Sequence, residues 1–236
     1  MSSNTQQEQS RSAAAVGQDG PFVSAGPSHI VWSYRSLFKR ALDYALTLIF
    51  LPFILPFAAI VTLLIKLDSP GPVLVKVKRI GKDRTTFFKY KFRTMVPDAE
   101  MVLQELLNTD SELRQEYLST YKIKNDPRIT RFGRWLRRTS LDELPQVLNI
   151  VRGEMSWVGP RDILDTELAM YGEFASTFVT VKPGITGLWQ VSGRSRLPYS
   201  ERVRLDMFYI ENVSFSLDLK IIAKTIPVVL FGDGAV

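Results

Sequence analysis

The feature that most constrains the fold is an almost wholly apolar segment, residues 45–65. About 20 apolar residues are enough to cross a bilayer as a helix. Pro52 and Pro56 lie inside the segment, and a proline in a helix interior removes a hydrogen bond and kinks the axis. Lysine and arginine flank both ends, and positive flanks favour the cytoplasmic side. The sequence therefore favours a re-entrant membrane hairpin, with a membrane-spanning helix and a buried helix of a soluble protein as alternatives.

Composition narrows the chemistry that the chain can perform. The 236 residues suffice for one domain with a core and a tail. A net charge of +6 and a pI near 9.5 indicate an anionic partner such as a nucleotide phosphate or anionic lipid, or simply surface charge for solubility. Cysteine is absent, and His29, the single histidine, lies in a polar stretch. This composition argues against disulfides, cysteine-bound zinc and histidine-dependent nucleophilic catalysis.

Three parts are predicted along the chain. Residues 1–31 are polar without an apolar period and predict a flexible tail. Residues 32–68 form the predicted re-entrant hairpin, and residues 69–236 form a compact domain. Apolar alternation predicts strands at residues 73–77 and 86–92, with a further short strand within 182–190. Helical patterns cover residues 97–121, 129–136, 164–171, 199–210 and 217–230, and a further helix ends at Gly153. The predicted fold is mostly α with a small β element (α+β).

The predicted helix at residues 129–136 is short, basic and amphipathic. Ile129, Phe132, Trp135 and Leu136 share one face, and arginines occupy the rest. Such a helix is typical of the membrane interface, with aromatic side chains in lipid and arginines at the headgroups. An ordinary surface helix packed on a core fits the same pattern equally well.

An acidic pair, Asp142-Glu143, follows a cluster of arginines: Arg128, Arg131, Arg134, Arg137 and Arg138. Neighbouring guanidiniums favour ionised carboxylates and match phosphate oxygens in geometry. Carboxylates that hold a divalent metal beside phosphate donors are the minimum equipment for phosphoryl transfer. The alternative is structural: Ser140 and Glu143 have the spacing of a helix capping box, or Asp142 caps the helix and Pro145 lies at its third position, where the missing N–H costs nothing.

Further cations are candidates for phosphate binding. Lys91 and Arg93 alternate with aromatic residues on a predicted strand and would share one face. Arg161 follows a Gly-Pro turn, and Arg194 lies in a glycine loop. Each signal is weak alone. Neither a P-loop nor a dinucleotide-binding glycine motif is present.

Together these stretches resemble the bacterial sugar transferase family, the monotopic phosphoglycosyl transferases. The resemblance runs in order from about Phe38 to Phe231 and rests on several motifs: KRALD (39–43), KLDSPGPV (66–73), KFRTM (91–95), TSLDELPQ (139–146), GPR (159–161) and VKPGITG (181–187) with WQV (189–191).

The resemblance implies an enzyme that moves a hexose 1-phosphate from a UDP-sugar to a polyprenyl phosphate, typically undecaprenyl phosphate, and releases UMP. It implies an aspartyl phosphosugar intermediate on Asp142 and Mg²⁺ held by Glu143. Lys91, Arg137 and Arg161 match positions that bind phosphates or position this pair, and we add Arg93 and Arg194 as candidates. Pro56 matches the proline that breaks the re-entrant helix. The implied location is the cytoplasmic face of the bacterial inner membrane.

The sequence departs from the family pattern at several positions. Leu55 stands where a serine commonly precedes the helix-breaking proline, and the chain ends in valine where a tyrosine is common. Asp162 stands where proline is usual and would add a negative charge beside Arg161. The variant LWQVSGR (188–194) resembles hexose 1-phosphate transferases, which favours UDP-galactose or UDP-glucose.

The alternative function is a catalytically silent membrane scaffold of polysaccharide assembly. Nucleic-acid binding would explain the pI but not the apolar segment, and no recognition motif of that class is visible. We therefore expect no nucleic-acid partner, and the sequence leaves a homo-oligomer open.

Overall fold

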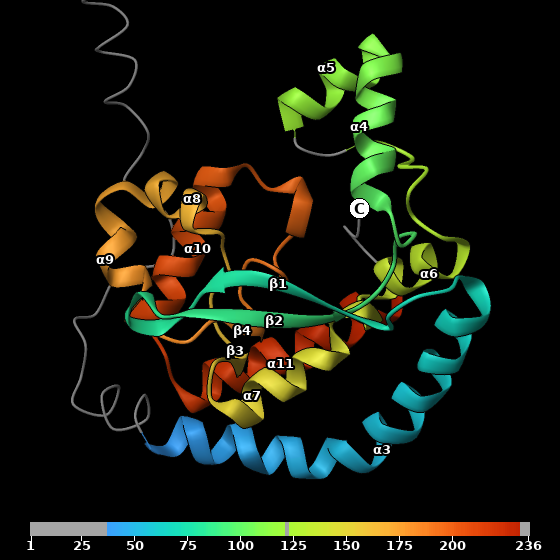
Figure 1. Cartoon of the computed structure of the whole chain (residues 1–236). Coiled ribbons are helices and arrows are strands. Elements are labelled where there is room, and N and C mark those ends of the chain that lie inside the picture. Colours follow the sequence, from blue (N-terminus) through green and yellow to red (C-terminus); the bar gives the residue numbers. More distant parts are fainter. Residues whose placement is uncertain (1–36, 121–122, 232–236) are drawn as a thin grey trace, which may run out of the picture.

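The computed structural model describes residues 37–120 and 123–231 (Figure 1). The predicted tail, residues 1–31, lies outside this range, as do His29 and the first residues of the predicted hairpin. The described chain is mostly helical with small two-stranded sheets, so the expected mostly α architecture with a small β element is confirmed. The longer helices are α3 (Lys39–Asp68), α4 (Ala99–Thr109), α5 (Ser111–Thr120), α6 (Arg131–Thr139), α10 (Tyr199–Glu211) and α11 (Phe215–Phe231).

Shorter helical elements connect them. They are η2 (Lys82–Arg84), η3 (Leu141–Gln146), α7 (Val147–Arg152), α8 (Asp165–Leu168), η4 (Ala169–Phe174), α9 (Ala175–Phe178) and η5 (Arg194–Arg196), where η marks a 3₁₀ helix. The predicted helix at 164–171 is therefore divided between α8 and η4, whereas the helices predicted at 199–210 and 217–230 are confirmed.

The apolar segment forms the single helix α3, which continues through Pro52 and Pro56. Figure 1 shows that it bends between its blue first half and its cyan second half and wraps around the rest of the molecule. It is long and apolar enough to cross a membrane. Only 11% of an 18-residue apolar stretch within it is buried inside the protein. Phe53 is 72% exposed and Leu48 70%. The alternative of a buried soluble helix is therefore wrong, and α3 is bent but continuous through both prolines.

The first half of α3 is fixed to the body by polar contacts. Lys39 Nζ lies 2.6 Å from Asp218 Oδ2 on α11. Asp43, which is 3% exposed, accepts hydrogen bonds from Ser156 Oγ at 2.8 Å and from the backbone N–H of Trp157 at 3.0 Å. A buried carboxylate is tolerated only when its oxygens are paired in this way. These contacts hold the start of α3 against the strand that begins at Ser156.

The second half of α3 is fixed to the same body by apolar contacts. Val61 and Ile65 are 1% and 2% exposed and pack with Phe92 and Leu136 in one buried cluster. Burying such side chains contributes roughly 1.5–3 kcal/mol each. Both ends of α3 therefore attach to one folded domain, and the exposed apolar residues lie between them.

An antiparallel hairpin crosses the middle of the molecule (Figure 1). Its strands are β1 (Leu74–Ile80) and β2 (Thr86–Phe92), paired from Leu74 with Phe92 to Ile80 with Thr86. Both strands were predicted, although β1 extends further than the sequence indicated. The register fixes Lys89, Lys91 and Arg93 at alternate positions, so these cations share one face.

A second, parallel pair joins β3 (Ser156–Val158) to β4 (Gly184–Thr186). A Cβ on Gly184 would lie 2.1 Å from the backbone N of Gly159, so only glycine permits this approach. The strand predicted within 182–190 is confirmed as β4. The three-residue strand β3 was not predicted from the sequence.

The helix predicted over residues 97–121 is two helices, α4 and α5, separated at Asp110. Asp110 has an extended backbone, with φ −123° and ψ 108°. Its Oδ1 accepts from the backbone N–H groups of Glu112 and Leu113 at 2.9 and 3.0 Å. Asp110 thus caps the start of α5, a local preference of aspartate that the apolar period concealed.

The aromatic face predicted at residues 129–136 is divided in the structure. On α6, Leu136 is fully buried and Phe132 packs against the same cluster, whereas Trp135 is 44% exposed. The rings of Phe132 and Trp135 stack with centroids 5.4 Å apart. The helix therefore packs on a core and presents Trp135 at the surface.

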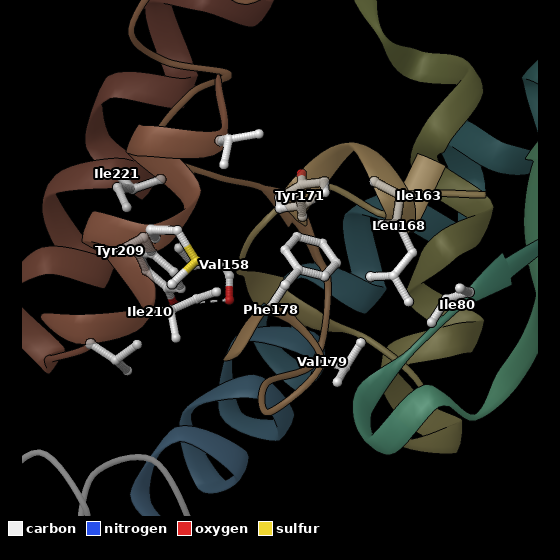
Figure 2. Packing of buried hydrophobic residues seen from close by; sticks show 13 residues of the cluster. Ile80, Val158, Ile163, Leu168, Tyr171, Phe178, Val179, Tyr209, Ile210 and Ile221 are labelled. Atoms are coloured by element: carbon white, nitrogen blue, oxygen red, sulfur yellow. Dashed lines mark hydrogen bonds between the residues drawn. The ribbon is translucent and has the colours of Figure 1, made fainter. Parts of the chain in front are cut away.

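The largest core cluster lies among α8, α9, α10 and the hairpin turn (Figure 2). Tyr171 and Phe178 meet there with ring centroids 4.2 Å apart. Tyr209 donates to the backbone oxygen of Val158 at 3.1 Å, which Figure 2 draws as a dashed line. This cluster supports one side of the hairpin, and the Phe92–Leu136 cluster supports its other end.

Candidate active site

The acidic pair lies on the 3₁₀ helix η3, directly after α6. Ser140 adopts a left-handed backbone (φ 57°, ψ 17°) and ends α6, and its side chain makes no capping hydrogen bond to η3. The capping-box interpretation of Ser140 and Glu143 is therefore wrong. The sharp turn at Ser140 brings both carboxylates beneath the hairpin strand β2, which contacts η3.

Lys91 joins the hairpin to the acidic pair. Its Nζ lies 3.1 Å from Asp142 Oδ2 and 2.8 Å from Glu143 Oε1. The Asp142 side chain is 9% exposed, whereas those of Lys91 and Glu143 are 25% and 26% exposed. One ammonium thus bridges two carboxylates at the edge of a cavity, with Asp142 as the more buried of the two.

The environment changes the pKa values of these carboxyl groups in opposite directions. Burial raises the pKa of Asp142 above its ordinary value, and Lys91 only partly opposes this. Burial also acts to raise the pKa of Glu143. The positive charges of Lys91 and Lys89 have the larger effect and hold this pKa below the ordinary value. Two carboxyl groups with separated pKa values are a common sign of different roles at one site.

The arginine cluster contributes less than the sequence indicated. Arg128 is a buried ion-pair partner of Asp126, with Arg128 Nη2 2.7 Å from Asp126 Oδ2. Arg131, Arg134 and Arg138 are exposed, and within the cluster only Arg137 lines the cavity. The cation that contacts Asp142 is Lys91, so the expectation that arginines keep Asp142 ionised is corrected. Burial outweighs the surrounding positive charge at this carboxyl group.

The cavity has a volume of about 630 Å³ and collects every predicted phosphate-binding residue: Lys91, Arg93, Arg137, Arg161 and Arg194. Lys89 and Arg79 also line it, against the carboxylates of Asp142, Glu143 and Asp162. Positive groups therefore outnumber negative ones around its wall. Such a lining favours a ligand with several negative charges. Pro52 and Pro56 do not belong to this lining and lie on α3.

The guanidiniums are held in different ways. Arg137 Nε donates to Thr94 Oγ1 at 2.9 Å. Arg93 Nη2 donates to the backbone oxygen of Ser69 at 2.6 Å, and within the described chain its buried Nε and Nη1 have no hydrogen-bond partner. Arg93 thus supports the turn after α3 and retains donors for a ligand.

Arg161 is positioned by an aromatic stack. Its guanidinium lies over the Trp189 ring at 5.1 Å, and Arg202 lies 5.6 Å from the same ring and 4.0 Å from that of Tyr199. Guanidiniums bind aromatic faces by cation–π attraction. Trp189 thereby fixes the side chain of Arg161 at the cavity wall.

Sequence reasoning missed an ion-pair cluster at the cavity wall. Asp162 Oδ2 lies 2.5 Å from Lys89 Nζ and 2.7 Å from Arg79 Nε. Although Asp162 is buried, these two cations hold its pKa well below the ordinary range. Its ion pairs are with Lys89 and Arg79, and the charge of the neighbouring Arg161 also lowers its pKa, as expected for a negative charge beside this arginine. Lys89 was detectable, because it lies two positions before Lys91 on the same strand face.

The donor set is compatible with magnesium. In the described part of the chain no group of three or more Asp, Glu, His or Cys residues converges as a complete metal site. Mg²⁺ needs no such group, because it usually binds one or two carboxylates together with substrate phosphates and water. Glu143, ionised and about one quarter exposed at the cavity, provides a hard oxygen ligand of this kind.

Comparison with known proteins identifies relatives along most of the chain. The model of the bacterial sugar transferase family matches residues 34–232. The chain is 45% identical over 197 residues to the UDP-galactose-lipid carrier transferase of Erwinia amylovora, which covers 84% of this chain and 41% of that protein. It is 47% identical over 165 residues to the undecaprenyl-phosphate galactose phosphotransferase of Salmonella typhimurium, covering 70% of this chain and 35% of that one.

A shorter relative matches from end to end. The exopolysaccharide production protein ExoY of Rhizobium meliloti is 38% identical over 223 residues, covering 94% of this chain and 99% of ExoY. The chain therefore spans about two fifths of the length of the Erwinia protein and nearly all of ExoY.

We predict that Asp162→Ala destabilises the fold by about 3–5 kcal/mol, because it leaves the buried Lys89 ammonium without its partner. The pKa of Asp162 is lower in the folded than in the unfolded state. Its contribution to the free energy of unfolding is therefore fully present above the unfolded pKa of about 3.9 and is lost as the pH falls from there through the folded pKa. Urea unfolding in detergent would measure the change. Glu201→Ala, which breaks the exposed pair with Arg204, should cost only about 0–1 kcal/mol. Equal losses in the two variants would contradict the prediction.

Proposed function

The chain belongs to the bacterial sugar transferase family, and we propose that it transfers a hexose 1-phosphate from a UDP-sugar to undecaprenyl or another polyprenyl phosphate, releasing UMP. The observation that carries the proposal is the Asp142–Lys91–Glu143 arrangement at the edge of a strongly basic cavity. This reaction would begin the assembly of an exopolysaccharide, O-antigen or capsule. The names of the Erwinia, Salmonella and Rhizobium relatives support the lipid carrier and the pathway.

Asp142 is the proposed nucleophile. Its carboxylate attacks the β-phosphorus of the UDP-sugar, the bond from that phosphorus to the bridging oxygen breaks, and UMP leaves with the bond electrons. The phosphate of the lipid carrier then attacks the same phosphorus, the bond to Asp142 breaks, and the carboxylate is restored. Two anionic substrates can thereby use one basic cavity in turn.

Lys91 has two roles in this scheme. The carboxylates of Glu143 and Asp142 raise the pKa of Lys91 despite its burial, so the ammonium stays protonated. It orients Asp142 and offsets the negative charge that gathers during attack. Arg137, Arg161 and Arg93 bind the phosphate oxygens of the UDP-sugar around it, and Arg194 is a further phosphate-binding candidate in the cavity wall.

Glu143 would hold Mg²⁺ together with the diphosphate of the substrate. When bound there, the ion supplies charge neutralisation to the phosphoryl group. The depressed pKa of Glu143 keeps it ionised for this role throughout the neutral range.

UDP-galactose is the proposed sugar donor, followed by UDP-glucose. The printed names of the Erwinia and Salmonella relatives specify galactose. A screen of UMP release across UDP-sugars tests this choice, and preference for an N-acetylated sugar would overturn it.

The proposed location is the cytoplasmic face of the inner membrane, with residues 32–68, which include α3, as a re-entrant anchor and residues 69–236 as the catalytic domain. Both ends of α3 contact this one domain, while the apolar residues between them are exposed. A straight span would carry the two ends to opposite faces of the bilayer. The bend allows the exposed stretch to enter lipid while both ends stay on one side.

A catalytically silent scaffold remains the alternative function, and activity of the purified chain separates the two. We predict that the wild type accumulates a phosphosugar adduct when incubated with UDP-galactose and Mg²⁺, and that a chelator prevents it. Asp142→Asn should abolish both the adduct and UMP release, because the amide is not a nucleophile. Intact-protein mass spectrometry detects the adduct. Asp165→Asn, at an exposed position, is the matched control, and turnover by Asp142→Asn would refute the nucleophile assignment.

We predict that Lys91→Met moves the acidic limb of the pH profile of kcat/KM to higher pH. Burial raises the pKa of Asp142 and Lys91 opposes this, so removal of the ammonium raises it further. Asp142 attacks only when ionised, and activity therefore falls as the pH drops through its pKa. Lys76→Met, at an exposed position on β1 outside the cavity lining, should leave the limb unchanged. A limb that stays in place or moves to lower pH in Lys91→Met would contradict this.

The chain contains no cysteine, so an introduced thiol is a unique label. We predict that Leu37→Cys and Leu67→Cys, each 75% exposed and near opposite ends of α3, react with an impermeant maleimide only from the cytoplasmic face. Met101→Cys on α4, 65% exposed, marks the side of the catalytic domain. Labelling of the two α3 positions from opposite faces would show a membrane-spanning helix.

A further inference from the structure

A second cavity, of about 550 Å³, lies between α3 and α11. Phe50, Phe53, Ile54 and Phe57 of α3 line one wall, and Ile222 and Val229 belong to the wall formed by α11. The volume falls within the range of about 300–1,000 Å³ that is typical of ligand sites. We call this cavity the apolar groove.

Away from the end that adjoins the basic cavity, polar side chains in the wall of the apolar groove are paired within the protein, as two examples show. Trp157 Nε1 donates to the backbone oxygen of Asp43 at 3.1 Å. Thr225 Oγ1 and Thr186 Oγ1 share a hydrogen bond of 2.7 Å. The groove therefore offers a hydrocarbon lining over most of its length, and an occupant there must be apolar.

The apolar groove adjoins the basic cavity, because Ser140, Glu143, Gln190 and Arg194 line both. At this junction Arg194 Nη2 donates to Ser140 Oγ at 2.8 Å. Among the described residues, the buried Nη1 of Arg194 and Oε1 of Gln190 have no hydrogen-bond partner. Arg194 also has a left-handed backbone, with φ 54°, which is uncommon for a residue with a side chain and is often found at ligand sites.

We infer that the apolar groove holds the phosphate-proximal isoprene units of the lipid carrier and that Arg194 receives the carrier's phosphate at the junction. The inference rests on the proposed function, since it assigns a place to one of the two proposed substrates. The groove matches the hydrocarbon chain and the unpartnered guanidinium N–H matches the phosphate. The isoprene units themselves carry no polar group. This agrees with a groove in which the polar side chains away from the junction already have hydrogen-bond partners.

This assignment divides the cations of the site between the two substrates. Lys91, Arg137 and Arg161 line the basic cavity without lining the groove, and they serve the UDP-sugar. Arg194 lies where both cavities meet, beside Asp142 and Glu143, whose negative charges partly offset the effect of burial on its pKa. The carrier thus approaches Asp142 from the side of α3, and the nucleotide approaches from the side of the hairpin.

An ordinary membrane lipid is the competing occupant, and continuity with the basic cavity argues against it. A phospholipid also has a phosphate that a guanidinium can bind, but only the lipid substrate of the proposed transfer needs its phosphate beside the acidic pair. The remaining length of a polyprenyl chain can leave the groove along exposed apolar residues of α3 outside the groove lining, such as Leu48 and Leu55.

Kinetics of the full chain in detergent micelles, with undecaprenyl phosphate and UDP-galactose, test the inference. Ile54→Trp narrows the groove and should raise the KM for the carrier about tenfold, while leaving the KM for the UDP-sugar and the rate of adduct formation unchanged. Ile60→Trp, on the same helix but outside the groove lining, is the matched control. Val229→Trp makes the same test from the opposite wall if Ile54→Trp does not fold.

Arg194→Gln should slow transfer to the carrier by about tenfold to hundredfold, the effect of losing a hydrogen bond to a charged group, with adduct formation preserved. If the Ile54 and Val229 variants behave like Ile60→Trp, or if Arg194→Gln raises the KM for UDP-galactose instead, the assignment of the groove is overturned while the proposed function stands. If the wild type forms no adduct and releases no UMP, the proposed function itself fails.

Discussion

The ammonium of Lys91 is the interaction on which the rest of the site depends. It joins a hairpin strand to a 3₁₀ helix by contacting both Asp142 and Glu143. A partly buried ion pair contributes little net stability, because desolvation of the charges offsets their attraction. Its value is positional and electrostatic: it fixes two carboxylates side by side while burial raises the pKa of one and surrounding lysines lower that of the other. One cation thereby allows two carboxyl groups that are adjacent in sequence to differ in pKa, as their proposed roles of nucleophile and metal ligand require.

Elements with a strong local period could be predicted from the sequence, and elements set by a single backbone turn could not. The strands of the hairpin follow their apolar patterns, because a half-buried face dictates the spacing. The helix α10 was also predicted, and it is exposed only at Ser200, Arg204 and Glu211. Ser140 illustrates the opposite case: its spacing to Glu143 indicated a capping box, yet tertiary packing places it in the left-handed region and ends α6 there. Asp110 similarly divides a continuous apolar pattern by capping α5 with its own side chain.

Within the site, sequence reasoning found residues by their chemistry but not their partners. The predicted cations do line one cavity, whereas the arginine cluster is largely dispersed into surface positions and the Arg128–Asp126 pair. Asp162 was noticed as a departure from the family pattern. Its contacts with Lys89 and Arg79 depend on the approach of β1 to the segment after β3, where Ile80 bridges Ile163, and neither spacing nor composition encodes that approach.

The bent helix α3 connects the location of the protein to its chemistry. Its ends are fixed by different means, Asp43 by hydrogen bonds and Val61 by apolar packing, so the intervening stretch is held close to α11 without being covered. A straight span would carry this stretch away from α11 and remove one wall of the apolar groove. In the proposed re-entrant arrangement, the bend therefore does more than keep both ends on one face of the membrane. It holds hydrocarbon-lined space next to Arg194 and the acidic pair, where the two proposed substrates, a lipid-borne phosphate and a nucleotide sugar, would both reach Asp142.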